Sequence, residues 1–302
     1  MSFFDNALVA TLPMFPKVLT RRVARRYVAG ASLADAISTV RSIMDRGSLA
    51  TIDVLGENTQ TVEESREAVS TYREVLSFIQ NESLDANISV KPTHLGLRIG
   101  RDLCLRNIEE LVVEAKRAGN FVRIDMEDHS TTTDTLAIYR ELRGRHDDIG
   151  VAIQAYMRRS QQDVQSLASE KANFRLCKGI YVEPPEIAFQ MMSEINENFV
   201  ALLKMMLEAG SYVGIATHDD ELIARSEAII EKLGLGTNDY EFQMLLGVRE
   251  ETRQEVMSRG HRMRVYVPFG RDWYPYSMRR LKENPKLVRH IIRELLKWER
   301  FP

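Results

Sequence analysis

The stretch RVYVPFG, residues Arg264–Gly270, and the RDWYPYSMRRLKENP that follows it, residues Arg271–Pro285, decide how the chain is understood. The first half alternates β-forming residues and predicts a short buried strand that ends at Pro268 and Gly270. The second half predicts a helix stopped by Asn284 and the proline after it. The segment is therefore a strand that leads directly into a helix.

The predicted helix gathers charge on one side. Tyr276, Arg279, Arg280 and Glu283 fall at spacings of three and four residues, which places them together on a helix. Two adjacent guanidiniums beside aromatic rings form a fork that suits a small carboxylate. The alternative is a solvated face with one internal Arg–Glu pair, but the aromatic residues nearby are costly in water.

Short apolar or β-branched runs recur along the chain, and segments with helical spacing separate them. Regular alternation of this kind predicts an α/β fold with a parallel sheet covered by helices, and eight repeats match a closed (βα)8 TIM-like barrel. The eight runs are Ala50–Leu55, Asn87–Val90, Phe121–Met126, Gly150–Ala155, Phe174–Cys177, Tyr212–Ala216, Tyr240–Met244 and Arg264–Val267. The helical segments include Val62–Ile79, Leu103–Ala118, Thr133–Leu142, Pro185–Leu207 and Glu221–Leu233.

An open, doubly wound sheet is the alternative architecture. No strand is followed by the GxGxxG that such a sheet carries when it binds a dinucleotide, and Gly234 and Gly236 indicate a helix C-cap and turn. We therefore expect two parts. Residues 1–48 form an N-terminal helical segment, and residues 49–302 form the barrel, with a helix over Lys286–Lys297 after the last strand.

Composition limits the class of protein. A net charge of −2 over 302 residues suits one large or two small domains and implies no nucleic-acid partner. Cys104 and Cys177 lie in apolar segments, so we expect reduced core residues of a cytoplasmic protein and no metal site. The N-terminus lacks the apolar core of a signal peptide, and no run approaches the ~18 apolar residues of a membrane span.

The N-terminal segment is of a different kind. Apolar residues between Phe3 and Phe15 precede basic residues between Lys17 and Arg26. One interpretation is a basic amphipathic segment that makes peripheral contact with the inner membrane surface. The other is an ordinary helix pair packed on the body of the protein.

In such barrels the working groups lie at the C-terminal ends of the strands. A ring of buried cationic, acidic and amide side chains there is expected around a polar ligand. The polar residues at or just past the predicted strands are Glu57, Lys91, Asp125, Glu127, Asp128, Gln154, Arg175, Lys178, Thr217, His218, Asp219, Glu241, Gln243 and Tyr266.

Three chemistries could use this ring. A desolvated Lys91 or Lys178 could form a Schiff base, as in an aldolase-like lyase. Acidic residues and histidines near Asp125 could hold a metal, but paired-histidine spacing is absent and neighbouring cations would repel it, so we expect none. A bulky anionic cofactor could place phosphates against Lys178, His218 and the amides around Gly179, beside a pocket for a substrate carboxylate.

Seven motifs stand in series between about residues 50 and 285. They are VKPTHLGL (Val90–Leu97), RIDMED (Arg123–Asp128), QAY (Gln154–Tyr156), RLCKGIY (Arg175–Tyr181), ATHD (Ala216–Asp219), EFQML (Glu241–Leu245) and YSMRRLKE (Tyr276–Glu283). A single piece such as ATHD is a weak signal, but the joint pattern is highly specific. It resembles proline dehydrogenase in its small, monofunctional bacterial form.

That resemblance implies non-covalent FAD and oxidation of L-proline to Δ1-pyrroline-5-carboxylate. Hydride would pass from proline C5 to flavin N5, and electrons would go on to a membrane quinone. Arg175 would stabilise charge on the reduced flavin, and Asp125 would orient the cationic groups. Glu57 would pair with Arg279 to close the site over substrate.

The resemblance also implies the binding residues. Those for the proline carboxylate would be Lys91, Arg279 and Arg280, and those that wall the ring would be Leu245, Tyr266 and Tyr276. Those for the cofactor would be Met126, Gln154, Arg175, Lys178, Gly179, Ile180, Thr217 and His218.

Three positions depart from the expected pattern, namely Pro92, Ile180 and Leu246. Pro92 biases Lys91 to an extended backbone, which suits a strand end. Two rival functions stay open: the Schiff-base lyase, and a non-catalytic barrel that senses a flavin or an amino acid. Flavin absorbance near about 450 nm would separate the lyase from the flavoprotein.

Overall fold

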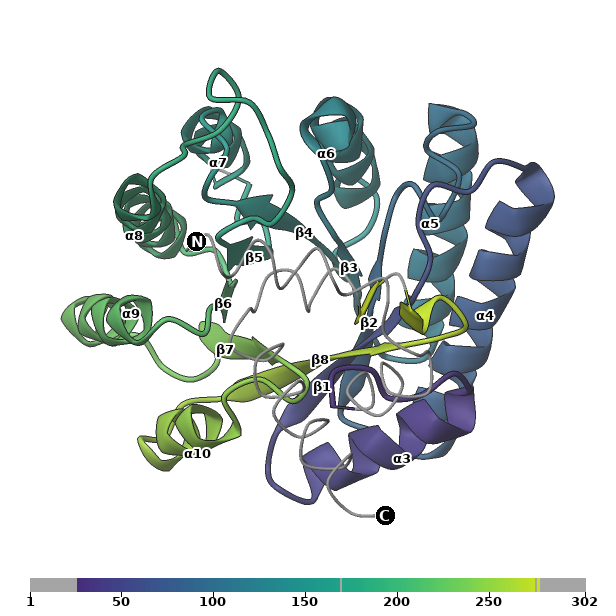
Figure 1. Cartoon of the computed structure of the whole chain (residues 1–302), viewed down its shortest axis with the longest axis horizontal. Coiled ribbons are helices and arrows are strands. Elements are labelled where there is room, and N and C mark those ends of the chain that lie inside the picture. Colours follow the sequence, from purple (N-terminus) through teal and green to yellow (C-terminus); the bar gives the residue numbers. More distant parts are fainter. Residues whose placement is uncertain (1–25, 169, 275, 278–302) are drawn as a thin grey trace, which may run out of the picture.

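The computed structural model describes residues 26–168, 170–274 and 276–277. Within them, strands and helices alternate around one ring (Figure 1). The strands are β1 (Leu49–Val54), β2 (Ala86–Val90), β3 (Val122–Ile124), β4 (Ile149–Gln154), β5 (Phe174–Cys177), β6 (Val213–Ala216), β7 (Tyr240–Leu245) and β8 (Met263–Phe269). The helices are α3 (Leu33–Met44), α4 (Val62–Asn81), α5 (Arg101–Arg117), α6 (His129–Arg143), α7 (Ser160–Ala168), α8 (Met192–Glu208), α9 (Asp220–Leu233) and α10 (Glu250–Ser258).

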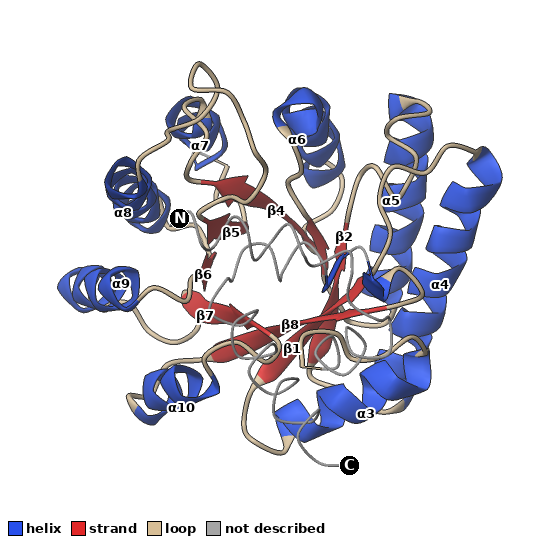
Figure 2. Ribbon diagram, in the orientation of Figure 1, coloured by secondary structure: helices blue, strands red, loops and turns tan. Residues whose placement is uncertain are grey.

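The strands close into a barrel. They are parallel and hydrogen-bonded in chain order, and β8 pairs with β1 from Leu49 beside Arg264 to Val54 beside Phe269. Figure 2 shows the ring of strands inside the ring of helices. The predicted (βα)8 barrel is confirmed, and each predicted strand overlaps an observed one.

The last strand runs further than predicted. The predicted run stopped at Val267, with Pro268 and Gly270 ending the strand, whereas β8 includes Pro268 and continues to Phe269, directly before Gly270. Pro268 has no N–H to donate, yet its carbonyl accepts from Ala29 N at 2.8 Å, and the Phe269 carbonyl accepts from Leu55 N at 2.8 Å. Pairing with β1 therefore continues through the proline to Phe269.

The local sequence explains where α4 begins and where α9 ends. Thr61 caps α4 in a capping box, in which its side chain accepts from Glu64 N and the Glu64 side chain accepts from Thr61 N. Gly234 ends α9 in the left-handed conformation with φ of 64°, as its predicted role as a C-cap requires.

One predicted helix is partly wrong. The segment Pro185–Leu207 has helical spacing, but α8 begins only at Met192. The residues before it form a loop in which Phe189 N donates to Tyr156 O at 2.8 Å and Ala188 makes a β-bridge with Met157. Apolar residues in this loop pack into a small cluster with Tyr156, so burial produced the apolar spacing without a helix.

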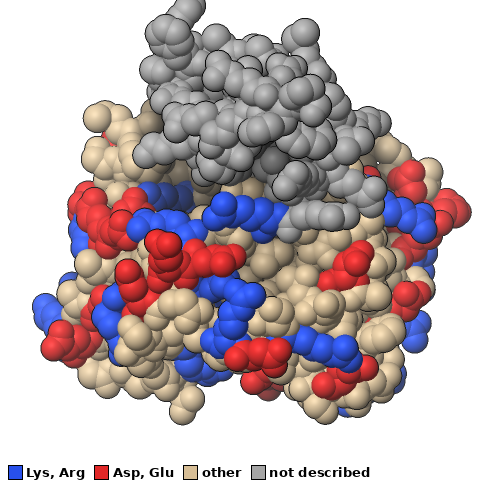
Figure 3. Space-filling model, turned by 60° about the horizontal axis from the view of Figure 1, so that its bottom comes forward, with Lys and Arg blue, Asp and Glu red and all other residues tan. Residues whose placement is uncertain are grey.

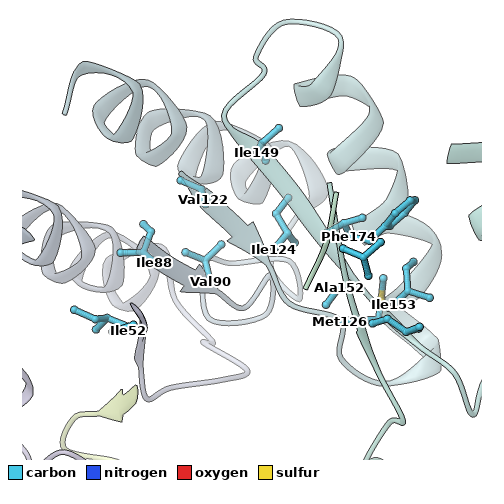
Figure 4. Packing of buried hydrophobic residues seen from close by; sticks show 14 of the residues in the cluster. Ile52, Ile88, Val90, Val122, Ile124, Met126, Ile149, Ala152, Ile153 and Phe174 are labelled. Carbon is cyan, nitrogen blue, oxygen red and sulfur yellow. The ribbon is translucent and has the colours of Figure 1, made fainter. Parts of the chain in front are cut away.

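Apolar side chains fill the space between strands and helices. Ile52, Ile88, Val122, Ile124 and Phe174 belong to one continuous core and are fully buried. Figure 4 shows several of these side chains projecting from successive strands toward the helical layer. Burial of this large apolar surface is the main term that stabilises the barrel.

The inside of the barrel is polar. Arg175 of β5 contacts Gln243 of β7 and Asp125, which directly follows β3, and Tyr266 of β8 also contacts Asp125. These strands are not neighbours, so the contacts cross the interior. Barrel interiors are usually packed with branched apolar side chains, and polar ones here indicate a function.

The ends of the chain are described only in part. Of the predicted N-terminal helices, α3 is present and contacts β1 and β8. The basic N-terminal residues up to Arg25 and the predicted helix Lys286–Lys297 lie outside the described residues. The division at residue 48 stays a prediction.

The visible surface carries charge of both signs. Figure 3 shows lysine and arginine interspersed with aspartate and glutamate on one face of the molecule. Among the described residues, none of the helices combines the length and apolar character that a membrane span requires.

Candidate active site

A cavity of about 690 Å³ opens at the C-terminal ends of the strands. Its volume falls in the range of pockets that hold cofactors and small molecules. Twelve of the predicted site residues line it: Lys91, Asp125, Met126, Arg175, Lys178, Gly179, Ile180, Thr217, His218, Leu245, Tyr266 and Tyr276. The structure thus brings together most of the predicted set.

The remaining predicted residues fall elsewhere. Gln154 is buried next to this region, and its Nε2 donates to the Glu127 carbonyl at 2.7 Å. Glu57 is exposed on the loop after β1. Arg279 and Arg280 lie outside the described residues, so their carboxylate fork and the Glu57–Arg279 gate stay predictions.

The start of the predicted last helix is buried rather than solvated. Tyr276 is buried and clusters with Val28 and Leu55, with Trp273 packed against them. Ser277 Oγ donates to the Trp273 carbonyl at 2.6 Å, a contact four residues back that is typical of a helix. The aromatic residues therefore anchor this segment beside the cavity.

Asp125 is the centre of the hydrogen-bond network in the cavity. Its carboxylate accepts from Tyr266 Oη at 2.8 Å, from Ser89 Oγ at 2.7 Å and from the Arg175 guanidinium. The Arg175 guanidinium also lies over the Tyr266 ring, 5.2 Å from its centroid. Burial and then the Asp125 charge raise the pKa of Tyr266 well above its usual value, so the phenol stays protonated and donates.

Lys91 is held by a carboxylate that the sequence analysis did not select. Its Nζ donates to both oxygens of Asp53, at 2.6 and 2.7 Å, and Asp53 is fully buried. Burial disfavours the ammonium, but the Asp53 and Asp125 charges outweigh it and raise the pKa of Lys91. A charged Lys91 can bind a carboxylate and cannot act as the free amine that Schiff-base chemistry needs.

Asp53 could have been found from strand alternation. In β1 the polar Thr51 and Asp53 alternate with Ala50, Ile52 and Val54. A period of two puts the polar pair on the face opposite the apolar residues, which here is the barrel interior. Treating the whole run as continuously apolar concealed this.

The far end of the cavity is lined by ion pairs. Lys178 Nζ lies 2.6 Å from Asp219 Oδ2, and Arg249 pairs with Asp220 while donating to the His218 carbonyl at 2.9 Å. His218 Nε2 accepts from Leu245 N at 2.9 Å, so its neutral ring carries its proton on Nδ1. The lysine and the arginine suit a polyanionic group such as a cofactor phosphate.

Two features fit a flavin nucleotide. Gln154 Oε1 is buried and has no hydrogen-bond partner among the described residues, which leaves an acceptor for a ligand N–H. Gly179 has φ of +104°, and a Cβ there would lie 2.1 Å from the Tyr156 ring, so the wall is shaped by the missing side chain. The residues present therefore fit the cofactor that the resemblance implies.

Several cavity residues were missed or placed differently by the sequence analysis. Glu127, Gln243 and Arg249 line the cavity, although only the first two were noticed, as strand-end residues, and none was given a role. Cys104 is buried as predicted, whereas Cys177 is half-buried and lines the cavity. Burial raises the pKa of the Cys177 thiol to about 11, so it stays protonated.

We expect His94 to make the folded protein less stable in acid. It lies in the loop after β2, packed so closely that a Cβ on Gly56 would be 2.2 Å from its Nε2. Burial, followed by the Lys91 charge, lowers its pKa from 6.5 to about 4. The unfolded chain therefore binds the proton more readily, and stability falls as pH drops from about 6.5 toward 4.

The expected size of this effect can be measured by urea unfolding. Between pH 7 and pH 4.5 the wild type should lose about 2 kcal/mol more than His94→Gln, which has no ring to protonate, at ~1.4 kcal/mol per unit of pKa shift. Equal losses in the two proteins would show that His94 is not held neutral.

A parallel (βα)8 barrel with a charged cavity at the C-terminal strand ends places the chain in the class of (βα)8-barrel enzymes. The proline dehydrogenase family profile matches residues 36–291. The chain belongs to the proline dehydrogenase family, whose members are oxidoreductases that act on a CH–NH group.

Individual relatives agree. Proline dehydrogenase 1 of Bacillus subtilis (strain 168) is 36% identical over 288 residues, which cover 95% of each chain. Proline dehydrogenase of Deinococcus radiodurans is 32% identical over 280 residues, which cover 91% of this chain and 90% of that one. Proline utilization A from Bdellovibrio bacteriovorus inactivated by N-propargylglycine has a crystal structure that matches with a TM-score of 0.81 at 26% identity, over 87% of this chain and 32% of the longer one.

Proposed function

We propose that the protein uses non-covalently bound FAD to oxidise L-proline to Δ1-pyrroline-5-carboxylate and passes the electrons to a quinone. The carrying observation is the pair of neighbouring networks in the cavity, Lys91 with Asp53 and Arg175 with Asp125. The first supplies a fixed ammonium for a substrate carboxylate. The second supplies a fixed guanidinium where negative charge develops.

One set of side chains binds and orients the substrate, and another holds the cofactor. Lys91, with Arg279 and Arg280 from the segment after β8, binds the carboxylate, while Leu245, Tyr266 and Tyr276 wall the apolar ring and exclude water. The cofactor is held by Met126, Gln154, Arg175, Lys178, Gly179, Ile180, Thr217 and His218. Bound FAD would supply the acceptor of the hydride that leaves proline C5.

The gate and the cellular setting belong to the same proposal. Glu57 pairs with Arg279 to cover the substrate once it is bound. The protein is cytoplasmic, and its basic N-terminal residues bind the inner membrane surface. This contact gives the protein access to a membrane quinone. The basic residues between Lys17 and Arg26 support this placement.

The cofactor and the product test the proposal. The purified protein should be yellow, and heat or acid should release a chromophore that co-migrates with FAD rather than FMN. Incubation with L-proline and a soluble quinone should give a product two hydrogens lighter than proline. A colourless protein, or a product formed without oxidation, would support the lyase instead. A yellow protein that leaves proline unchanged would support the sensor.

Tyr266 should make the enzyme select against 4-hydroxyproline. Its hydroxyl is tied to Asp125 at 2.8 Å and lies 3.5 Å from Lys91 Nζ, so the ring cannot swing away to admit a larger substrate. We expect kcat/KM for 4-hydroxyproline to be at least about tenfold below that for L-proline. Comparable values for the two substrates would remove Tyr266 from its role in the pocket.

A further inference from the structure

A line of buried side chains reaches Arg175 from the far end of the barrel interior. Arg264 Nε donates to Glu241 Oε1 at 2.6 Å, and Gln243 Nε2 donates to the same oxygen at 2.7 Å. At its other end, Gln243 Oε1 accepts from Arg175 Nε at 2.6 Å. Both Glu241 and Gln243 are almost fully buried.

We propose that Glu241 and Gln243 are positioning residues that fix the orientation of the Arg175 guanidinium. This inference rests on the proposed function, because it assigns to Arg175 the stabilisation of charge on a bound flavin. Neither residue is placed in contact with the substrate, and both act through Arg175.

The chemistry of the amide dictates the direction of the contacts. A glutamine side chain donates from one end and accepts at the other. Burial opposes ionisation of Glu241, but Arg264 outweighs it and lowers the pKa of Glu241, so this carboxylate only accepts. Gln243 must therefore turn its NH2 toward Glu241 and its carbonyl oxygen toward Arg175. A flipped amide would set donor against donor at Arg175.

The backbone makes room for this line. Gly214 of β6 lies in register between Arg175 of β5 and Glu241 of β7. A Cβ on Gly214 would be 2.4 Å from Gln243 Nε2. Because Gly214 has no side chain, Gln243 can extend across the intervening strand β6 and reach Arg175.

Two contacts on different edges hold a planar guanidinium in one plane. Arg175 Nη1 donates to Asp125 and to Ser89 Oγ, and Nε donates to Gln243. Without the second contact, the guanidinium could pivot about the first. A cation that is turned away from the developing charge stabilises it less, which lowers both the reduction potential of a bound flavin and the rate of its reduction.

The test exchanges the two side chains. In Glu241→Gln the new amide can donate to Gln243. No contact then requires Gln243 to turn its carbonyl oxygen toward Arg175. In Gln243→Glu two carboxylates face each other, and the new charge competes with Asp125 for Arg175. The double variant E241Q/Q243E restores one carboxylate, one amide and an acceptor for each arginine.

We expect each single variant to have a more negative flavin reduction potential, measured by chemical titration of the bound flavin. Reduction by saturating L-proline should slow about tenfold, with KM changed less than about twofold. The double variant should reduce the flavin faster than Gln243→Glu, because only one carboxylate remains in the line, but its potential should stay more negative than that of the wild type, because the charge at position 243 still faces Arg175. Glu197→Gln, on the surface of α8 where the carboxylate pairs with Arg225, is the control and should change neither.

The nearly isosteric Glu241→Gln guards against a folding failure of the other single variant. A wild-type potential and rate in Glu241→Gln would overturn the inference, and so would a folded double variant that is no faster than Gln243→Glu. If the wild type holds flavin that L-proline does not reduce, the proposed function fails, while the series of potentials still decides the inference. A wild type that binds no flavin overturns both.

Discussion

Replacing Asp53 with Asn is expected to raise KM for L-proline by about tenfold to a hundredfold at neutral pH. Asp53 holds Lys91 Nζ through both carboxylate oxygens, at 2.6 and 2.7 Å, and is itself fully buried. An amide cannot balance the ammonium, so the pKa of Lys91 falls and the lysine loses its proton. A lost charge-assisted contact to the substrate carboxylate is worth about 1.5–3 kcal/mol.

The same variant should show two further signs. Its KM should fall again at lower pH, because the free amine of Lys91 regains its proton there, whereas the KM of the wild type should change much less over the same range. Its free energy of unfolding should drop by about 3–5 kcal/mol, the usual effect of removing one partner of a buried ion pair. Steady-state kinetics from pH 6.5 to 8.5 and urea unfolding measure these effects.

Glu82→Gln provides the contrast. Glu82 pairs with Arg41 on the surface, where the two side chains are 36% and 55% exposed, so its removal should cost at most about 1 kcal/mol and leave KM unchanged. A KM within about twofold of wild type for Asp53→Asn would show that Lys91 does not depend on Asp53 for its charge.

Gly179→Ala is expected to yield protein that has lost most of its flavin, with affinity for FAD lowered at least about tenfold. The position has φ of +104°, which an L side chain adopts only with strain, and the added Cβ would lie 2.1 Å from the Tyr156 ring. The backbone or the tyrosine must move, and either shift displaces the cavity wall beside Lys178. Fluorescence titration of the flavin-free protein with FAD measures the change.

Gly210→Ala is the control that separates the effect of backbone strain from the effect of a steric clash. Gly210 also has positive φ, +74°, but a Cβ there would meet no atom within 4 Å. We therefore expect it to cost about 1–2 kcal/mol of stability and to leave FAD affinity unchanged. Wild-type affinity in Gly179→Ala would remove that glycine from the cofactor site.

The fold could be predicted because the apolar runs, their regular repeat and a helix-end residue all indicate the same (βα)8 barrel. Apolar runs at regular intervals indicated parallel strands, the eightfold repeat indicated closure, and the helix-end glycine Gly234 adopts the conformation expected of it. The Pro185–Leu207 error shows the limit of periodicity. Apolar spacing reports which residues are buried, and a loop that packs against Tyr156 can reproduce the spacing of a helix.

The site could be predicted less completely. Residues just past the strand ends, such as Lys91 and Lys178, could be predicted because a barrel exposes those positions to its cavity. Asp53 was missed because its strand was treated as a continuous apolar run, and the contact of Glu241 with Arg264 joins two interior side chains that only the folded barrel shows to be paired. The roles of Arg279 and Arg280 rest on sequence and resemblance alone.

We infer that the cavity binds L-proline by its carboxylate and transfers its hydride to a bound flavin. Anaerobic addition of L-proline, followed by the visible absorbance of the protein near about 450 nm, tests it most directly. We expect L-proline to bleach this band, and we expect pyrrolidine, which has the same ring but no carboxylate, to bleach it far more slowly at equal concentration. An unchanged band with L-proline, or equal bleaching by the two compounds, would contradict it.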